Sequence, residues 1–252
     1  MAKKASSGAA KKTPSKPRKT RRSKAAQEPR PWRRLGRWAL YAVAGWFGLT
    51  LLAVTVFAIF NPPVTPYVLS ERARLGEVDR RWVDIEEIAP VMVRSVVAAE
   101  DANFCLHWGF DMRAIRFALE EGGQRGASTI SQQVVKNVYL WHGRSWARKA
   151  LEALTTPVLE LVWTKRRVLE VYLNVAEFGE GVFGIEAAAR QAFGVSAAKL
   201  SPQQAALLAT VLPNPKDRSA VRPTERQLAR AKVIASGADT IRVDGRAACF
   251  ES

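Results

Sequence analysis

The feature that most constrains this chain is an uninterrupted apolar run near its N-terminus. From Trp38 to Phe60 there are 23 residues without a charged side chain, WALYAVAGWFGLTLLAVTVFAIF. A helix of about 20 apolar residues spans the hydrocarbon core of a bilayer. A cleavable signal peptide has a shorter apolar stretch followed by a small-residue cleavage site, whereas Asn-Pro-Pro follows this run at 61–63. The sequence therefore predicts a transmembrane helix over residues 38–60, in preference to a buried core helix.

The basic charge of the chain is concentrated in front of this run. The net charge is +16, and residues 1–37 hold 14 of the 39 Lys and Arg residues but only one acidic residue, Glu28. This composition buries too little apolar surface to fold, so we expect a disordered tail over 1–37. Arginines just before a span favour a cytoplasmic N-terminus, with residues 61–252 outside. The tail is interpreted as a topology signal with affinity for anionic lipid, and not as a nucleic-acid-binding segment.

Beyond a linker at 61–84, the sequence has the periodicity of helices. Apolar residues recur three and four apart from residue 85 onward, and no convincing alternating strand pattern is present. The pattern predicts an all-α domain over 85–236, followed by a loose tail over 237–252. The predicted helices cover 86–102, 111–121, 129–139, 146–162, 165–175, 183–193, 201–211 and 224–236. Cys105 and Cys249 are too few for a disulfide framework, so they are interpreted as a buried small residue and a tail residue.

One carboxylate falls on an apolar helix face. Val93, Val96, Val97 and Glu100 are spaced three and four apart, and Phe104 continues the same spacing. A carboxylate in that position is either paired with a cation or desolvated with a raised pKa, as suits a general base. Taken alone, a structural ion pair remains the stronger interpretation. The neighbouring Asp101 is expected to make local capping and hydrogen-bonding contacts.

A second polar segment follows at 126–137. Thr129 and Gln132 form a capping-box pattern, so a helix is expected to begin there. Lys136 lies within two turns of that N-terminus, which makes an anion site reasonable. An amphipathic helix with a solvated polar face is the alternative. Farther along, Arg148 and Glu152 are four apart, which alone indicates an ordinary surface pair.

The order of five segments resolves these alternatives. The segments AAEDANFCLHWGFD, RGASTISQQVVKN, RKALE, KRRVLEVYLNVAEFGEGVFGIEAAA and LSPQQAALLATVLPNP resemble, in sequence and spacing, the five motifs of the family 51 glycosyltransferases. Among these, the monofunctional peptidoglycan transglycosylases are the best match. The resemblance covers about residues 85–225, and five motifs in order are far more specific than any single pattern.

The resemblance implies a lysozyme-like helical fold and a set of site residues. Glu100 corresponds to the base that deprotonates the acceptor's 4-hydroxyl, and Glu152 to a second essential glutamate near the donor diphosphate. Lys136 and Arg148 correspond to cations that stabilise the departing diphosphate. The remaining substrate-binding positions implied are Arg125, Ser128, Gln132, Gln133 and Asn137. Pro157 predicts a kink or break in the helix that carries Glu152.

The resemblance also implies the reaction and its setting. The expected enzyme is a single-pass protein of the bacterial cytoplasmic (inner) membrane, which transfers an undecaprenyl-diphosphate-linked glycan onto lipid II with inversion. No cofactor or metal is expected, although stimulation by a divalent cation stays open. Cell-wall synthesis or division proteins are candidate partners. An SxxK pattern at 196–199 has no accompanying KTG, so no transpeptidase is expected. The alternatives are a glycan-cleaving lytic transglycosylase or lysozyme-like enzyme, and a non-catalytic assembly scaffold.

Overall fold

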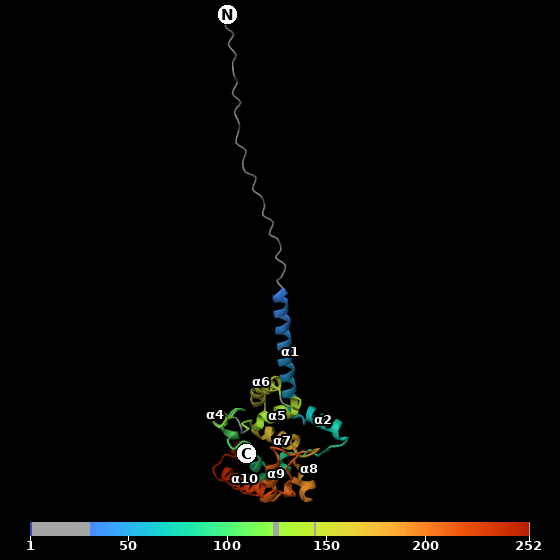
Figure 1. Cartoon of the computed structure of the whole chain (residues 1–252), viewed down its shortest axis with the longest axis vertical. Coiled ribbons are helices and arrows are strands. Elements are labelled where there is room, and N and C mark those ends of the chain that lie inside the picture. Colours follow the sequence, from blue (N-terminus) through green and yellow to red (C-terminus); the bar gives the residue numbers. More distant parts are fainter. Residues whose placement is uncertain (2–30, 123–125, 144, 252) are drawn as a thin grey trace. The chain divides into compact units, whose positions relative to one another are not determined.

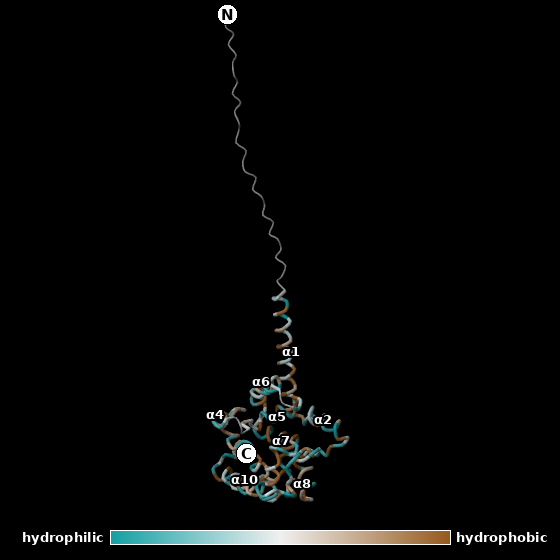
Figure 2. The backbone as a smooth tube through the Cα atoms, in the orientation of Figure 1, coloured by the Kyte–Doolittle hydropathy of each residue, from teal (hydrophilic) through white to brown (hydrophobic). Residues whose placement is uncertain are grey.

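The computed structural model describes residues 1, 31–122, 126–143 and 145–251. The chain divides into two units, Met1–Gly45 and Trp46–Ser252. Helix α1, Pro31–Ile59, contains the apolar run (Figure 1), and Figure 2 shows hydrophobic residues recurring along it. Its segment Arg34–Ile59 has a mean hydropathy of 2.1 in its most apolar stretch, only 6% of which is buried. A single helix long and apolar enough to cross a membrane is therefore confirmed among the described residues. It begins at Pro31, seven residues before the predicted span, so the prediction of a disordered tail is wrong for 31–37. Residues 2–30 of that tail lie outside the described residues.

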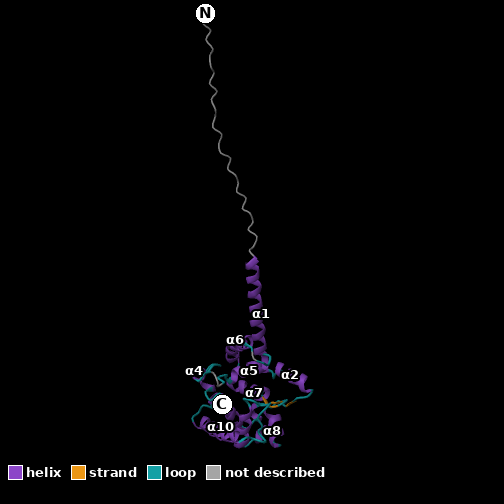
Figure 3. Cartoon of the chain, in the orientation of Figure 1, coloured by secondary structure: helices purple, strands orange, loops and turns teal. Residues whose placement is uncertain are grey.

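Helices build nearly all the regular structure of the second unit, as Figure 3 shows. This confirms the all-α prediction. The α-helices that follow α1 are α2 Pro66–Leu75, α3 Pro90–Glu100, α4 Met112–Glu120, α5 Ile130–Tyr139, α6 Trp146–Val162, α7 Lys165–Val175, α8 Ile185–Phe193, α9 Pro202–Val211, α10 Glu225–Val243 and α11 Ala248–Glu251. Single 3₁₀ turns are η1 Ile85–Glu87, η2 Phe104–Leu106 and η3 Ala197–Lys199.

Eight of these helices match predicted ones closely, and the differences have local causes. Helix α3 begins at Pro90 instead of residue 86, because proline at the first helical position starts the helix and a separate turn, η1, precedes it. It ends at Glu100, so Phe104 lies beyond the helix in η2 and is nevertheless fully buried. We predicted a kink or a break at Pro157. Helix α6 continues through this residue, so the prediction of a break is wrong.

The core of the second unit lies between two groups of packed helices. Helices α3, α9 and α10 pack against one another, and α5 packs against α6 and α7. At the crossing of α3 and α10, a side-chain carbon added to Gly237 would lie only 3.2 Å from Cβ of Ala98. The two helices therefore approach closely six residues before the end of α10 and two residues before Glu100.

A small sheet lies beside α7 and α8, although these segments carry no alternating strand pattern. Strands β1 Asp79–Arg80, β2 Glu177–Gly179 and β3 Val182–Phe183 pair in the order β1-β3-β2, with β1 parallel and β2 antiparallel to β3. Gly184 follows β3 at φ +85°, and a side-chain carbon there would lie 3.2 Å from the carbonyl oxygen of Asn174. Glycine is therefore required where the sheet meets α7.

The segment before the predicted domain boundary is part of the fold. Tyr67 and Val68 of α2 are buried against Phe183, whereas Leu69 is half exposed. The prediction of a linker over 61–84 is therefore wrong for Pro66–Leu75, because this segment is a helix whose Tyr67 and Val68 are buried in the domain.

The C-terminal segment is also folded, which corrects the prediction of a loose tail over 237–252. Helix α10 continues to Val243, and Phe250 of α11 is only 1% exposed. Cys105 and Cys249 form a disulfide, with their Cα atoms 5.8 Å apart. The interpretation of the two as a buried small residue and a tail residue missed this pairing. The cysteines are 144 positions apart, and no local pattern indicates a contact over that separation.

Candidate active site

The candidate site begins at the last residue of α3. Met92, Val93, Val96 and Val97 bury one face of this helix in the core. Glu100 is its final residue and is partly buried. The backbone N–H of Asp101 caps the helix on the carbonyl of Val97. The apolar stripe thus carries a carboxylate to the point where the helix opens into a loop.

The Glu100 carboxylate is desolvated and held on one side only. Nε2 of Gln133 donates to its Oε2 at 2.8 Å, and the Tyr172 hydroxyl donates to Oε1 of Gln133 at 3.2 Å. Burial raises the pKa of Glu100 above its ordinary value, against the lowering effects of the Gln133 hydrogen bond and of Lys136. Within the described residues, Oε1 of Glu100 has no hydrogen-bond partner, so it is available to a substrate hydroxyl.

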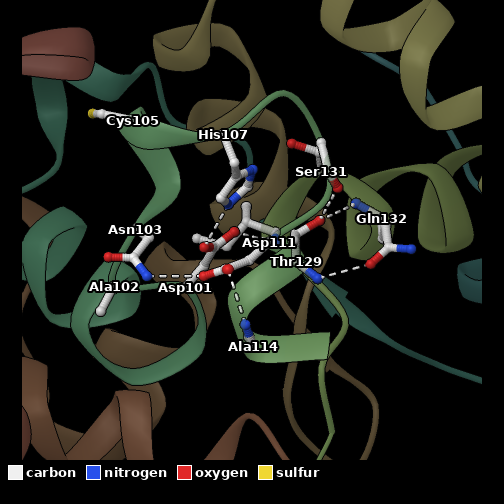
Figure 4. A network of polar contacts seen from close by, with 12 residues as sticks. Asp101, Ala102, Asn103, Cys105, His107, Asp111, Ala114, Thr129, Ser131 and Gln132 are labelled. Atoms are coloured by element: carbon white, nitrogen blue, oxygen red, sulfur yellow. Dashed lines mark hydrogen bonds and ion pairs between the residues drawn. The ribbon is translucent and has the colours of Figure 1, made fainter. Parts of the chain in front are cut away.

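Asp101 joins the end of α3 to the start of α5 (Figure 4). Its Oδ2 accepts from the backbone N–H of Ile130 at 3.1 Å, and its Oδ1 lies 2.8 Å from Nε2 of His107. Nearby, Asp111 caps α4 and accepts from Asn103 at 2.9 Å. The expected capping and hydrogen-bonding role of Asp101 is confirmed. Glu100 and the residues of α5 are held in register by this network.

The capping box predicted at the start of α5 is present. Oγ1 of Thr129 accepts from the N–H of Gln132 at 3.3 Å, and Oε1 of Gln132 accepts from the N–H of Thr129 at 3.0 Å. Gln132 is buried and lines neither of the two cavities described below. Its contacts therefore fix the helix start, while Gln133 on the next face reaches Glu100.

A first cavity, of about 260 Å³, lies along the other end of α5. Gln133, Lys136 and Asn137 line it together with Tyr172. Burial lowers the pKa of Lys136, while Glu152 and Glu100 act in the opposite direction. No hydrogen bond or ion pair is made by the Lys136 ammonium within residues 31–122, 126–143 and 145–251. A partly buried cation that makes no direct ion pair with a described residue suits an anionic ligand.

Sequence reasoning missed the opposite wall of this cavity. The ring of Tyr67 stacks on His142 with centroids 3.9 Å apart, and its hydroxyl donates to Glu177. Lys216 lies at the same cavity and pairs with Glu71 at 2.8 Å. Burial raises the pKa of Glu177 and lowers that of His142. No periodicity in the linker marked Tyr67, so its role emerges only from the folded chain.

Glu152 is the centre of a buried ionic cluster. It is 2% exposed, accepts from Arg148 at 2.7 Å, and also pairs with Lys149. Nε of Arg148 donates to the carbonyl of Gly143 at 2.8 Å, and Nζ of Lys149 donates to the Ser128 hydroxyl at 3.1 Å. The burial of Glu152 distinguishes this cluster from an ordinary surface pair. Two cations for one carboxylate leave net positive charge beside Lys136.

A second cavity, of about 370 Å³, lies at the C-terminal end of α3. Glu100, Asp101 and Ser128 line it, with Phe117 of α4 on a further side. The structure thus places Glu100 at this cavity and its partner Gln133 at the first one. The hydrogen bond between these two side chains therefore connects the linings of the two cavities.

Most of the predicted site residues are brought to neighbouring parts of this region, while Gln132 is buried at the start of α5. Glu100, Ser128, Gln133, Lys136 and Asn137 line the cavities. Arg148 and Glu152 line neither, and connect to them through Lys149 and Ser128. Arg125 lies outside the described residues.

A helical domain that follows a helix long and apolar enough to cross a membrane, with a desolvated carboxylate near clustered cations, has the features of an enzyme for an anionic substrate. The family model for transglycosylases matches residues 68–239. Proteins named biosynthetic peptidoglycan transglycosylase are similar to the chain over most of its length. That of Jannaschia sp. (strain CCS1) is 62% identical over 214 residues, which are 85% of this chain and 90% of that protein. That of Caulobacter vibrioides is 45% identical over 203 residues, which are 79% of this chain and 89% of that protein.

A third relative with the same name, from Rhizobium meliloti, is 48% identical over 199 residues, which are 77% of this chain and 84% of that protein. The chain therefore belongs to the transglycosylase family, as a monofunctional peptidoglycan glycosyltransferase. The resemblance drawn from the five motifs is confirmed. A glycan substrate such as lipid II and association with a membrane follow from this membership.

Proposed function

We propose that the protein lengthens glycan strands by transferring the growing chain from undecaprenyl diphosphate to the 4-hydroxyl of lipid II. The observation that carries this proposal is the state of Glu100. One carboxylate oxygen is held by Gln133, the other faces no described partner, and burial raises the pKa. A raised pKa strengthens a carboxylate as a proton acceptor once it is ionised, which is what a general base for a sugar hydroxyl requires.

The proposed step moves one proton and exchanges one bond. Oε1 of Glu100 accepts the proton of the 4-hydroxyl while that oxygen attacks the anomeric carbon of the donor. The bond from this carbon to the diphosphate oxygen breaks, and its electron pair leaves with undecaprenyl diphosphate. Attack in line on an α-linked diphosphate gives a β-1,4 bond with inversion.

The cations beside Glu152 and the unpaired Lys136 are proposed to stabilise the leaving diphosphate. Negative charge grows on the bridging oxygen during bond cleavage, and preorganised cations in a desolvated site lower the barrier for this. Glu152 holds Arg148 and Lys149 in place, at 2.7 Å for Arg148. Glu152 is therefore assigned to positioning these cations. Asn137, buried and lining the Lys136 cavity, is proposed to donate to the same ligand.

We further propose that the domain lies outside the cytoplasmic membrane with the N-terminus inside. The Arg and Lys excess before α1 supports this orientation. No organic cofactor is required by the proposed step, because side chains supply both the base and the cations. A divalent cation as a diphosphate counterion stays a prediction to be checked with EDTA.

The test compares the full-length protein with Glu100→Gln on fluorescent lipid II in detergent. We expect the wild type to form a polymer ladder that a muramidase collapses, and the variant to lose at least about 100-fold in rate. Polymer from Glu100→Gln at the wild-type rate would overturn its role as base. No polymer from folded wild type, under varied lipid and detergent, would overturn the transferase proposal and turn attention to cleavage of preformed glycan or to a scaffold.

A further inference from the structure

Residues Asp244–Glu251, here called the C-terminal clasp, cover the loop that follows Glu100. The disulfide joins Cys249 of the clasp to Cys105 of this loop. Nη1 of Arg246 donates to the carbonyl of Ala102 at 2.9 Å. The family match ends at residue 239, so the clasp lies beyond the part of the chain common to the family model.

The clasp is itself anchored in the core. Phe250 is 1% exposed and Ala247 5%. Arg166 of α7 donates to the carbonyl of Phe250 at 2.8 Å, and Arg94 of α3 pairs with Glu251 at 2.5 Å. Arg94 is also on the helix that ends in Glu100. The clasp therefore ties α7, α3 and the loop after α3 to one another.

The loop after Glu100 is thus held from two sides. On the inner side, Oδ2 of Asp101 accepts from the backbone N–H of Ile130. Its Oδ1 contacts His107, and Cys105 projects away from this contact, as Figure 4 shows. On the outer side, the clasp holds Ala102 and Cys105. Two and five residues separate these positions from Glu100, so any loosening of the clasp is transmitted to it over a short length of backbone.

We propose that the C-terminal clasp positions Glu100, and that its disulfide must be closed for full activity. This rests on the proposed role of Glu100 as the base. A closed clasp fixes the direction of the free carboxylate oxygen and keeps water from the Glu100 side chain. An open clasp leaves the fold in place but lets the loop move, which lowers the population of the reactive geometry.

Closing the clasp is an oxidation. The two thiols release two protons and two electrons, and a disulfide-bearing oxidant accepts them and becomes a dithiol. The Cys105 thiolate attacks that disulfide, and the Cys249 thiolate then displaces the oxidant. Such disulfides form and persist outside the cytoplasm, which agrees with the proposed orientation.

The experiment uses the full-length protein in detergent as oxidised wild type, dithiothreitol-reduced wild type and Cys105→Ala/Cys249→Ala. Polymerisation is measured over lipid II concentration and pH, and hydrogen exchange is followed at 101–106. We expect reduction and the double variant to lower kcat about tenfold or more with a smaller change in KM. We also expect faster exchange at 101–106, and an acid limb of the pH profile displaced to lower pH because water reaches Glu100. The reductant should not affect the double variant.

A second variant keeps the test valid if Cys105→Ala/Cys249→Ala folds poorly. Arg246→Ala removes the bond to Ala102 and a surface pair with Asp244, and leaves the disulfide. Arg242→Ala, which breaks only an exposed pair with Asp239, is its matched control. Arg246→Ala should share the kinetic signature in weaker form. An unchanged pH profile together with unchanged exchange at 101–106 would overturn the proposal, as would a rate loss equal to the unfolded fraction. Absence of polymer from oxidised wild type would refute the proposed function, while the exchange comparison would still decide whether the clasp holds the loop.

Discussion

Gln133 donates a 2.8 Å hydrogen bond to Glu100 and accepts one of 3.2 Å from Tyr172. The amide therefore has a defined orientation, because the tyrosine hydroxyl can serve as donor to its oxygen while its nitrogen faces the carboxylate. This pairing stabilises the ionised form of Glu100 against its burial. The strength of the proposed base thus depends on a residue of α5 and on a tyrosine of α7.

The first prediction concerns Gln133→Leu. Loss of the donated hydrogen bond removes an effect that lowers the Glu100 pKa, so this pKa rises further. Because the base must be ionised, the acid limb of the rate profile should move to higher pH, and the rate near neutrality should fall about tenfold to a hundredfold. Polymerisation of lipid II across pH measures this. Gln191→Leu, on the exposed side of α8, is the control, and equal profiles for both variants would contradict the prediction.

The second prediction concerns Glu152→Gln. The change leaves Arg148 and Lys149 without their shared carboxylate, and should lower the polymerisation rate about a hundredfold. Stability should fall by about 1–3 kcal/mol, which is less than for a fully buried ion pair because Lys149 reaches solvent. Glu186→Gln is the matched control, since Glu186 is also buried and pairs with Arg190 at 2.5 Å on α8. An equal loss of polymerisation rate in both variants would mean that reduced stability alone explains the loss, and would contradict the prediction.

The third prediction concerns the pH dependence of stability at Glu177. Burial raises its pKa in the folded state, so the folded protein holds the proton more tightly than the unfolded chain does. Its contribution to stability is then present at low pH and is lost as pH rises through the folded pKa. Glu177→Gln removes this loss and keeps an acceptor for Tyr67. The difference in Tm, variant minus wild type, should become more positive between pH 4 and pH 8, and a difference that falls with pH would contradict it.

The fourth prediction concerns membrane orientation. In a Cys105→Ala/Cys249→Ala background, a cysteine is introduced at exposed Ser236. It should react with a membrane-impermeant maleimide in cells whose outer membrane is permeabilised and whose cytoplasmic membrane is intact. A cysteine at Ser7 should react only after the cytoplasmic membrane is also permeabilised. The reverse pattern would place the domain in the cytoplasm.

The sequence predicted what depends on local pattern, and missed what depends on distant contacts. Eight helices followed from apolar periodicity, and the start of α5 from its capping box, because both signals lie within a few residues. Strands of two or three residues carry no alternation to detect, and the sheet exists only because β1 meets β3 across a hundred positions. Tyr67 lay in a segment without periodicity, so its contacts with His142 and Glu177 were invisible.

The site shows the same division. Glu100 could be placed on an apolar face by spacing alone, and the structure buries that face. Glu152, by contrast, had the spacing of an ordinary helix pair, and only tertiary packing buries it. The disulfide between Cys105 and Cys249 was missed for the same reason, because pairing over 144 positions leaves no signal in local composition.

The close approach of Gly237 to Ala98 has a consequence for how variation in this chain should be interpreted. Gly237 is far from the five motifs in sequence and contacts no proposed substrate, yet a single methyl group there would press on the helix turn that ends in Glu100. We therefore expect a substitution at 237 to shift the end of α3 and to lower activity, although the residue lies outside the five motifs. Compensating changes should therefore be sought at Ala98, on the other side of the helix crossing.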